Sequence, residues 1–260
     1  MLNTAELDRL KSILDEHRPL PAAVVTNLQE DLRVRWTYNS NAIEGSTLTL
    51  QETKVILEGI TVGGKTLREH LEAVSHAEAI DLICSMATEE GRLTERELKD
   101  IHALVLKGID TENAGRYRRV NVTIAGAQHV PPSFLHLDQE MQDLFSVYTQ
   151  CDLHPVERAA RLHVDFVKIH PFMDGNGRTA RLIMNLELVR GGFPPVVIAM
   201  ANRLKYYQAL DLAHVQNDYD PFFELTEHLV VESFNPYWFA LGLEEQEIQA
   251  ADQHSSGLSM

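Results

Sequence analysis

Residues 170–181 read His-Pro-Phe-Met-Asp-Gly-Asn-Gly-Arg-Thr-Ala-Arg and lie between two segments with helical spacing of apolar residues. The first helix, over 155–169, is expected to end at a histidine followed by proline, and a new helix starts after the Asp-Gly-Asn-Gly turn. Glycines permit positive φ and a close backbone approach, so that successive N–H groups can form an anion-binding nest. The next helix adds the free N–H groups and the positive dipole end of its first turn. The sequence therefore predicts a phosphate site at this turn.

Four side chains of the same run carry complementary chemistry. Arg178 and Arg181 are three residues apart, so they share one helix face and can grip phosphate oxygens. Asp174 supplies a hard carboxylate oxygen, which is the kind of ligand that Mg²⁺ takes together with substrate phosphates. His170 can serve as a general base near neutral pH. Each residue alone has an ordinary structural interpretation, but their convergence within twelve residues favours a catalytic site.

The rest of the chain is mostly helical by its apolar spacing. The expected helices cover residues 5–17, 22–38, 50–57, 66–88, 94–107, 137–150, 155–170, 178–190, 203–216 and 221–240. Two of them begin at capping boxes, in which a threonine at 49 or 94 precedes a glutamate by three residues. The predicted fold class is therefore mostly α.

One segment departs from helical spacing. In residues 115–130, Val120, Val122 and Ile124 alternate with polar residues and Gly126 follows, which indicates a short β-hairpin. We expect residues 1–110 to form a helical region that packs on a core of residues 111–240, with 241–260 a flexible tail. Together they form one compact domain.

Composition narrows the classes of function. The 260 residues carry a net charge of -15, which argues against a nucleic-acid binder. No stretch reaches the roughly 18 apolar residues of a membrane helix, and the charged N-terminus does not resemble a secretion signal. Cys84 and Cys151 form no metal pattern and are expected to be reduced thiols. These features predict a cytoplasmic protein that binds neither nucleic acid nor membranes.

The run at 170–181 resembles the signature of the Fic family, His-Pro-Phe-x-Asp-Gly-Asn-Gly-Arg-x-x-Arg, and matches it at every fixed position. The resemblance extends over about residues 33–235 and includes Gly115-x-Tyr-Arg, His154-Pro and Arg203-x-x-Tyr-Tyr. It implies a Fic-type helical bundle with a small β-hairpin flap.

The resemblance also implies an activity. Such a protein is a nucleotidyltransferase that moves AMP from Mg²⁺-bound ATP to a Ser, Thr or Tyr hydroxyl of a target protein or of itself. His170 would take the proton of the hydroxyl, and Asp174 would bind Mg²⁺. The residues that would bind the nucleotide are Gly175, Asn176 (through its N–H group and its side chain), Gly177, Arg178 at the β-phosphate, Arg181 at the γ-phosphate and Tyr207 at the adenosine.

Two further expectations come with the family. The hairpin edge at Val122, Thr123 and Ile124 would pair with an extended segment of the target. Members often form homodimers. His214 stands where the family often has an asparagine, and this departure leaves the ribose contacts and the base preference open.

An inhibitory pattern of the family, Ser/Thr-x-x-x-Glu-Gly/Asn, matches Ser40, Glu44 and Gly45. The resemblance implies that Glu44 pairs with Arg181 and displaces the γ-phosphate that this arginine would hold. ATP would then bind only in a pose unfit for transfer.

Several alternatives stay open from sequence alone. Glu44 could also orient water for the removal of AMP from a modified target. Within the same fold, the group transferred could be UMP, phosphate or phosphocholine. From another class of protein, the chain could be a non-catalytic adaptor that binds nucleotide, although the intact His170 and Asp174 argue against that.

Overall fold

The chain folds mainly into α-helices, which confirms the predicted class. The computed structural model describes residues 2–89, 91–243 and 248. The helices in these residues are α1 (Thr4–Glu16), α2 (Ala22–Ile43), α3 (Leu50–Leu57), α4 (Leu67–Met86), α5 (Glu95–Val105), α6 (Leu137–Gln150), α7 (Pro155–Ile169), α8 (Asn176–Arg190), α9 (Arg203–Gln216), α10 (Asp220–Ser233) and α11 (Asn235–Leu241), with 3-10 turns at Phe134–His136 and Met200–Asn202.

Local capping fixes where three helices begin. Thr49, Thr66 and Thr94 each accept a hydrogen bond from the N–H of the glutamate three residues later. That glutamate in turn accepts from the N–H of the threonine, which completes a capping box. The first and third of these boxes were expected from the sequence. The second sets the start of α4, a helix that contributes to the candidate site.

Two helices end elsewhere than predicted. The expected helix 22–38 continues as α2 to Ile43, because the polar side chains of Thr37, Ser40 and Asn41 are buried against the rest of the fold. Apolar spacing cannot detect a helix turn that buries polar groups. The expected helix 221–240 is divided into α10 and α11 by Pro236, which has no N–H for a helical hydrogen bond.

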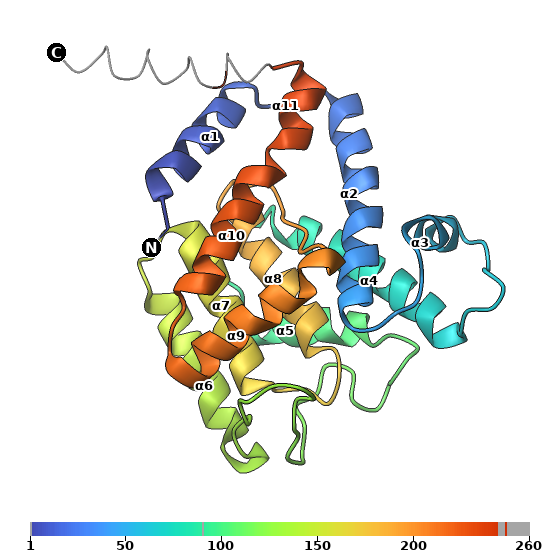
Figure 1. Cartoon of the computed structure of the whole chain (residues 1–260), viewed down its shortest axis with the longest axis vertical. Helices are drawn as coiled ribbons and strands as arrows, with labels where there is room; N and C mark the ends of the chain where they lie inside the picture. Colours follow the sequence, from blue (N-terminus) through green and yellow to red (C-terminus); the bar gives the residue numbers. More distant parts are fainter. Residues whose placement is uncertain (1, 90, 244–247, 249–260) are drawn as a thin grey trace.

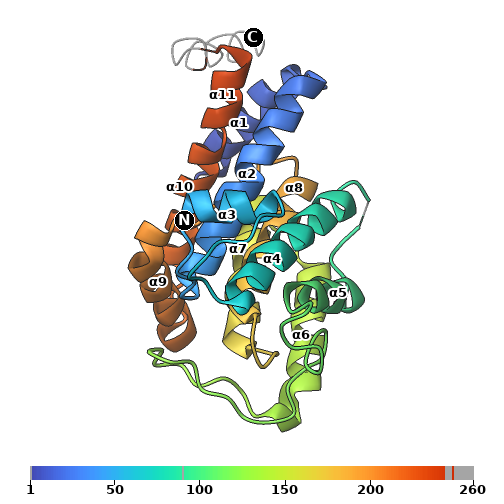
Figure 2. The same ribbon diagram turned by 90° about the vertical axis from the view of Figure 1, so that its right-hand side faces the viewer.

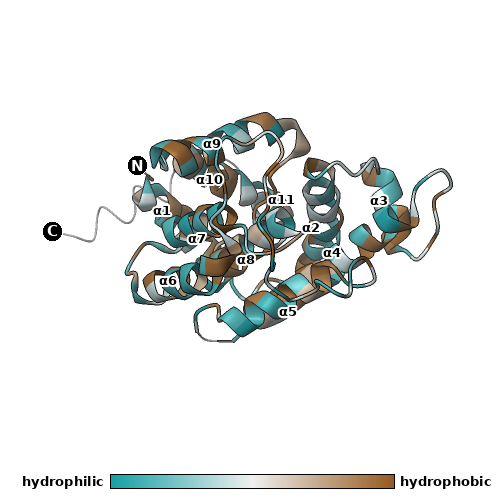
Figure 3. Cartoon of the chain, turned by 90° about the horizontal axis from the view of Figure 1, so that it is seen from below, coloured by the Kyte–Doolittle hydropathy of each residue, from teal (hydrophilic) through white to brown (hydrophobic). Residues whose placement is uncertain are grey.

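Helix α8 occupies the centre of the molecule (Figure 1). Twelve of its fifteen residues are buried, and α2, α4, α5 and α7 pack around it. Figure 3 shows hydrophilic and hydrophobic residues on the same helices, as expected for amphipathic segments around one core. The first turn of α8 is partly open to solvent, because Asn176 and Arg178 are buried whereas Gly177 is half-buried.

The prediction that segment 115–130 forms a β-hairpin of two paired strands is wrong. Within the described residues, segment 115–130 contains no strand but two extended arms joined by a turn, in which the Ile124 carbonyl accepts a hydrogen bond of 3.2 Å. The guanidinium of Arg118 donates to the carbonyls of Val120 and Pro132, at 2.9 and 2.6 Å. The arms are thus held by a side chain between them, which replaces a backbone ladder.

Three other expectations concern the chain as a whole. The predicted tail, 241–260, lies almost entirely outside the described residues. The division at residue 110 stays a prediction, and one hydrophobic core draws residues from both sides of it. In the described part of the chain, no helix combines the length and the apolar character needed to span a bilayer.

Five histidines are held neutral by the fold. Burial is the main cause: it lowers the pKa of His102, His170 and His214 to about 4, and it holds the pKa of His76 and His163 well below the usual range. The unfolded chain takes up a proton at each as the pH falls through about 6.5. The unfolded state therefore binds more protons, and stability falls with the pH.

The resulting pH dependence is testable. Between pH 6.5 and 4, each of the three histidines with a folded pKa of about 4 lowers the free energy of unfolding by at most about 1.4 kcal/mol per pH unit. We expect the melting temperature, measured by calorimetry, to be highest above pH 6.5 and to fall steeply toward pH 4. A melting temperature that stays constant across this window would contradict the neutral, buried imidazoles.

Candidate active site

The loop between α7 and α8 is held in an unusual backbone conformation. His170 is the C-cap of α7 and has φ 53° and ψ 59°, which non-glycine residues seldom adopt. Arg118 fixes this conformation, because its Nε donates to the His170 carbonyl and its backbone N–H donates to the Pro171 carbonyl, both at 2.9 Å. The loop and the arms of segment 115–130 lie at the same end of the molecule (Figure 2).

Asn176 braces the loop from inside. Its Oδ1 accepts from the N–H of Phe172 and its Nδ2 donates to the carbonyl of the same residue, both at 2.9 Å. The asparagine side chain, predicted as a phosphate ligand, is therefore engaged within the loop. Its backbone N–H and that of Gly177 remain in the first turn of α8, which has no side-chain cap.

His102 of α5 supports the loop, although it was not among the residues expected from the sequence. Its Nδ1 accepts a hydrogen bond from the N–H of Gly115 at 2.9 Å. The neutral ring then carries its proton on Nε2 and donates it to the Asp174 carbonyl at 3.0 Å. The ring also stacks on Phe172, with centroids 3.5 Å apart. A Cβ at Gly175 would lie 3.4 Å from this ring, and Gly175 has φ 76°, so glycine suits this position best.

His170 is half-buried and neutral. Burial is the main cause that lowers its pKa to about 4, and the charge of Arg118 lowers it further. Glu44 lies close enough to raise the pKa, but this effect is smaller. The imidazole is therefore unprotonated at neutral pH, which is the form that a general base needs.

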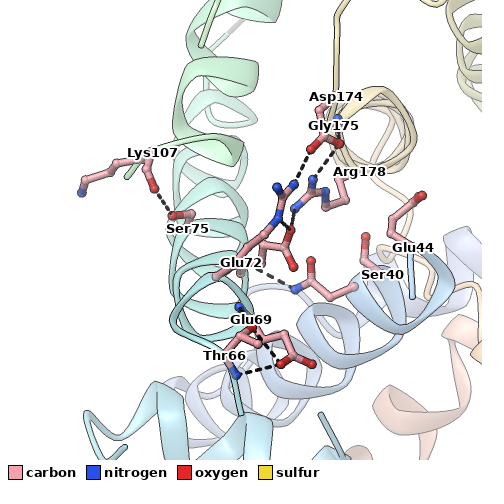
Figure 4. Close-up of polar contacts among 12 residues, drawn as sticks. Ser40, Glu44, Thr66, Glu69, Glu72, Ser75, Lys107, Asp174, Gly175 and Arg178 are labelled. Atoms are coloured by element: carbon pink, nitrogen blue, oxygen red, sulfur yellow. Dashed lines mark hydrogen bonds and ion pairs between the residues drawn. The ribbon is translucent and has the colours of Figure 1, made fainter. Parts of the chain in front are cut away.

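Asp174 presents an ionised carboxylate at the start of the α8 turn (Figure 4). Its Oδ1 accepts from the Gly175 N–H at 2.6 Å and from Arg178 at 3.2 Å, while its Oδ2 meets Arg68 at 2.6 Å. Burial would raise the pKa of Asp174, but Arg178, the Gly175 N–H and Arg68 together lower it from its ordinary value.

The residues around Asp174 suit a cation that brings its own ligands. Among the described residues, no cluster of three or more His, Cys, Asp or Glu side chains could hold a metal alone. Mg²⁺ is commonly held by one or two carboxylates, with phosphates and waters completing the shell. One half-exposed, ionised carboxylate beside the uncapped first turn of α8 fits that mode.

Arg178 is buried beneath Asp174. Its Nη1 lies 3.4 Å from Oε1 of Glu72 on α4, and its Nη2 lies 3.2 Å from Asp174. The side chain is 3% exposed, so its position is fixed by packing. Its guanidinium is thus placed next to the carboxylate expected to bind the metal.

Arg181 is paired with Glu44, as the resemblance implied. Its Nη2 lies 2.8 Å from Oε1 of Glu44 and also 2.8 Å from the Ser40 carbonyl, and its Nε donates to Ser40 Oγ at 3.0 Å. Ser40 lies in the last turn of α2, Glu44 is its C-cap, and Gly45 turns the chain at φ 102°. The predicted inhibitory segment and the second arginine of the loop are therefore in contact.

Glu44 also covers the first turn of α8. A Cβ placed on Gly177 would clash with Oε1 of Glu44, so the carboxylate lies directly over the glycine. The Glu44 side chain is 35% exposed and lies between Gly177 and solvent. An anion bound along the turn toward Arg181 would meet this carboxylate.

The two adjacent tyrosines of α9 differ in their surroundings. Tyr206 is fully buried, and its hydroxyl contacts Arg181 at 3.5 Å and His163 at 3.2 Å. Tyr207 is half-buried, and its hydroxyl donates to the Ile43 carbonyl at 3.4 Å, next to Glu44. Its predicted adenosine contact stays a prediction. His214 faces the Val164 carbonyl at 3.0 Å and belongs to the core.

The predicted docking edge keeps its backbone available. Thr123 is exposed, while Val122 and Ile124 are half-buried. In the described part of the chain, the N–H groups of these three residues make no hydrogen bond to the protein. Pairing with an extended peptide is therefore open to this arm, and its role in target docking stays a prediction.

Together, these features define a helical protein in which an uncapped, glycine-rich turn lies beside a neutral histidine, and a carboxylate of the chain itself pairs with one arginine. The Fic/DOC family profile matches residues 92–188. Protein adenylyltransferase Fic of Drosophila willistoni is 37% identical over 215 residues, which are 81% of this chain and 43% of that protein. Its counterpart from Nematostella vectensis is 37% identical over 235 residues, 88% of this chain and 53% of that protein.

Solved structures agree with these sequence matches. A Fic domain containing signaling protein from Bacteroides thetaiotaomicron superposes with a TM-score of 0.84 at 29% identity, covering 92% of this chain and 99% of that one. Fic-1 from C. elegans superposes with a TM-score of 0.81 at 30% identity, covering 91% of this chain and 72% of that one. The chain belongs to the Fic/DOC family. It spans about half the length of the curated relatives it matches.

Proposed function

We propose that this chain transfers AMP from Mg²⁺-bound ATP to a Ser, Thr or Tyr hydroxyl of a target protein, and to itself. The observation that carries the proposal is the α7–α8 loop, in which a neutral His170, an ionised Asp174 and the uncapped first turn of α8 lie within one signature. The relatives named protein adenylyltransferase Fic support AMP as the group that is moved.

In this mechanism the residues of the chain position charge and move one proton. The N–H groups of Asn176 and Gly177 and the guanidinium of Arg178 bind phosphate oxygens. Asp174 would hold Mg²⁺, which, when bound, neutralises charge on the phosphates. His170 takes the proton of the target hydroxyl while the hydroxyl oxygen forms a bond to the α-phosphorus of ATP. The bond from that phosphorus to the bridging oxygen breaks, and pyrophosphate leaves.

The same proposal includes autoinhibition by Glu44. Its carboxylate occupies Arg181, the cation that the family resemblance assigns to the γ-phosphate. A bound triphosphate would have to displace this anion or take a pose that leaves the α-phosphorus out of line with the hydroxyl. A related role for Glu44 is the removal of AMP from a modified target. This role is supported by the partial exposure of the Glu44 carboxylate and by its electrostatic effect on His170.

Three finer statements belong to the proposal. The transferase would act in the cytoplasm, which is supported by the free thiols of Cys84 and Cys151. It would form a homodimer, as the family resemblance implies, and sedimentation analysis would measure this. Its protein target would dock along Val122, Thr123 and Ile124.

Intact-mass spectrometry tests the activity. The Glu44→Gly variant, incubated with ATP and Mg²⁺, is expected to gain the mass of one or more AMP groups. The matched control carries His170→Ala in addition and should gain none. A mass gain of phosphate alone would show that the chain transfers phosphate and not AMP. If neither the variant nor a mixture of candidate target proteins gained an adduct, the chain would be better explained as a non-catalytic nucleotide-binding protein.

A further inference from the structure

Arg68 of α4 contacts the candidate metal ligand, although it lies outside the signature. Its Nη2 is 2.6 Å from Oδ2 of Asp174, across 106 positions of sequence. Its Nε donates to Oε1 of Glu72, one turn along α4, at 3.0 Å. The side chain is 57% exposed. A third cation therefore reaches the site from a helix that the signature does not include.

Arg68 and Arg178 form a pair of neighbouring guanidiniums. Both contact Oε1 of Glu72, and both contact the carboxylate of Asp174. Figure 4 shows Glu72 beside Arg178 and Asp174. Because the two arginines share the same two carboxylates, their heads lie close together. A phosphate bound by Arg178 would then be near Arg68 as well, and two guanidiniums suit one chain of phosphates.

The two arginines differ in freedom to move. Arg178 is enclosed by packing, whereas Arg68 is mostly in solvent and is tethered at Nε by Glu72. Oδ1 of Asp174 already receives the Gly175 N–H and Arg178, so Oδ2 is the oxygen left for a metal, and Arg68 occupies it. A Mg²⁺ bound at about 2.0–2.1 Å would repel the guanidinium from that oxygen.

We propose that Arg68 is a further nucleotide-binding residue, which pairs with Asp174 while no metal is bound and turns onto the terminal phosphates of ATP when a divalent cation takes its place. This inference rests on the proposed function, because it takes Asp174 as the metal ligand. Glu72 keeps the guanidinium over the site during the exchange. Arg68 is a positioning residue for the triphosphate and takes no part in proton transfer.

Binding measurements in the Glu44→Gly background test this role. With saturating Mg²⁺, Arg68→Gln is expected to weaken ATP binding roughly ten-fold, the effect of losing a charge-assisted contact. AMP, which has no terminal phosphates, should bind unchanged. In the absence of nucleotide, Arg68→Gln should bind Mn²⁺ several-fold tighter than the background variant, as measured by electron paramagnetic resonance. The reason is that the Arg68 guanidinium no longer competes for Asp174. Arg68→Lys keeps the charge and should restore part of the ATP affinity.

The matched control is Arg96→Gln on α5, since Arg96 is also a helix-surface arginine with a carboxylate four residues later and is 92% exposed. It should change none of these affinities. An unchanged ATP affinity or an unchanged Mn²⁺ affinity in Arg68→Gln overturns the proposal, as does an equal loss for ATP and AMP. These readouts need no group transfer. If the Glu44→Gly variant binds ATP but gains no AMP, the proposed function is refuted. The binding measurements on Arg68→Gln still decide the role of Arg68 in that case.

Discussion

Glu44→Gly is expected to raise the rate of AMP transfer by roughly 10²- to 10³-fold, the usual effect of one preorganised contact to transition-state charge. The substitution removes the carboxylate 2.8 Å from Nη2 of Arg181. It leaves the guanidinium in place, because Ser40 still holds it through Oγ and the backbone carbonyl. The γ-phosphate then gains its cation, and the carboxylate over Gly177 is gone.

The measurement is the initial rate of radiolabelled AMP incorporation from ATP. Glu58→Gly is a close control, since Glu58 is the C-cap of α3, is exposed and also precedes a glycine. Like Glu44→Gly, this substitution replaces a glutamate at the C-cap of a helix. We expect it to leave the rate of AMP incorporation equal to that of the unsubstituted chain. If Glu44→Gly labelled no faster than Glu58→Gly, the inhibitory role of Glu44 would be refuted.

His170→Ala is expected to reduce transfer in the Glu44→Gly background by 10²-fold or more, to the limit of detection, because general base catalysis is lost. Binding of ATP should persist, since the phosphates are held by α8 and the arginines. His228→Ala serves as the control, because His228 is an exposed histidine of α10 that pairs only with Glu232 among the described residues. Transfer at a comparable rate without His170 would show that another group takes the proton.

Much of the fold could be predicted from local sequence. Apolar spacing located the helices, and the threonine–glutamate pairs at 49 and 94 fixed two of their starts. The glycine turn at 175–177 was recognisable because glycine, aspartate and arginine each have a distinct chemical use there. These signals are local, since a capping box or an anion-binding turn needs only a few consecutive residues.

The rest depends on contacts between distant segments. His102 and Arg68 resemble an ordinary core histidine and an ordinary surface arginine until the fold brings them to Asp174. The pairing of Glu44 with Arg181, 137 positions apart, came from the family pattern and not from spacing. The strand prediction for segment 115–130 failed because Arg118 joins the two arms in place of a backbone ladder.

In the proposed mechanism, the α7–α8 turn binds a triphosphate and a divalent cation while His170 faces the attacking hydroxyl. A crystal structure of the Glu44→Gly variant with a non-hydrolysable ATP analogue and Mg²⁺ tests it most directly. We predict phosphate oxygens at the N–H groups of Asn176 and Gly177, the cation on Asp174, and the imidazole of His170 toward the α-phosphorus. Nucleotide bound away from this turn, or an imidazole directed into the core, would contradict the account.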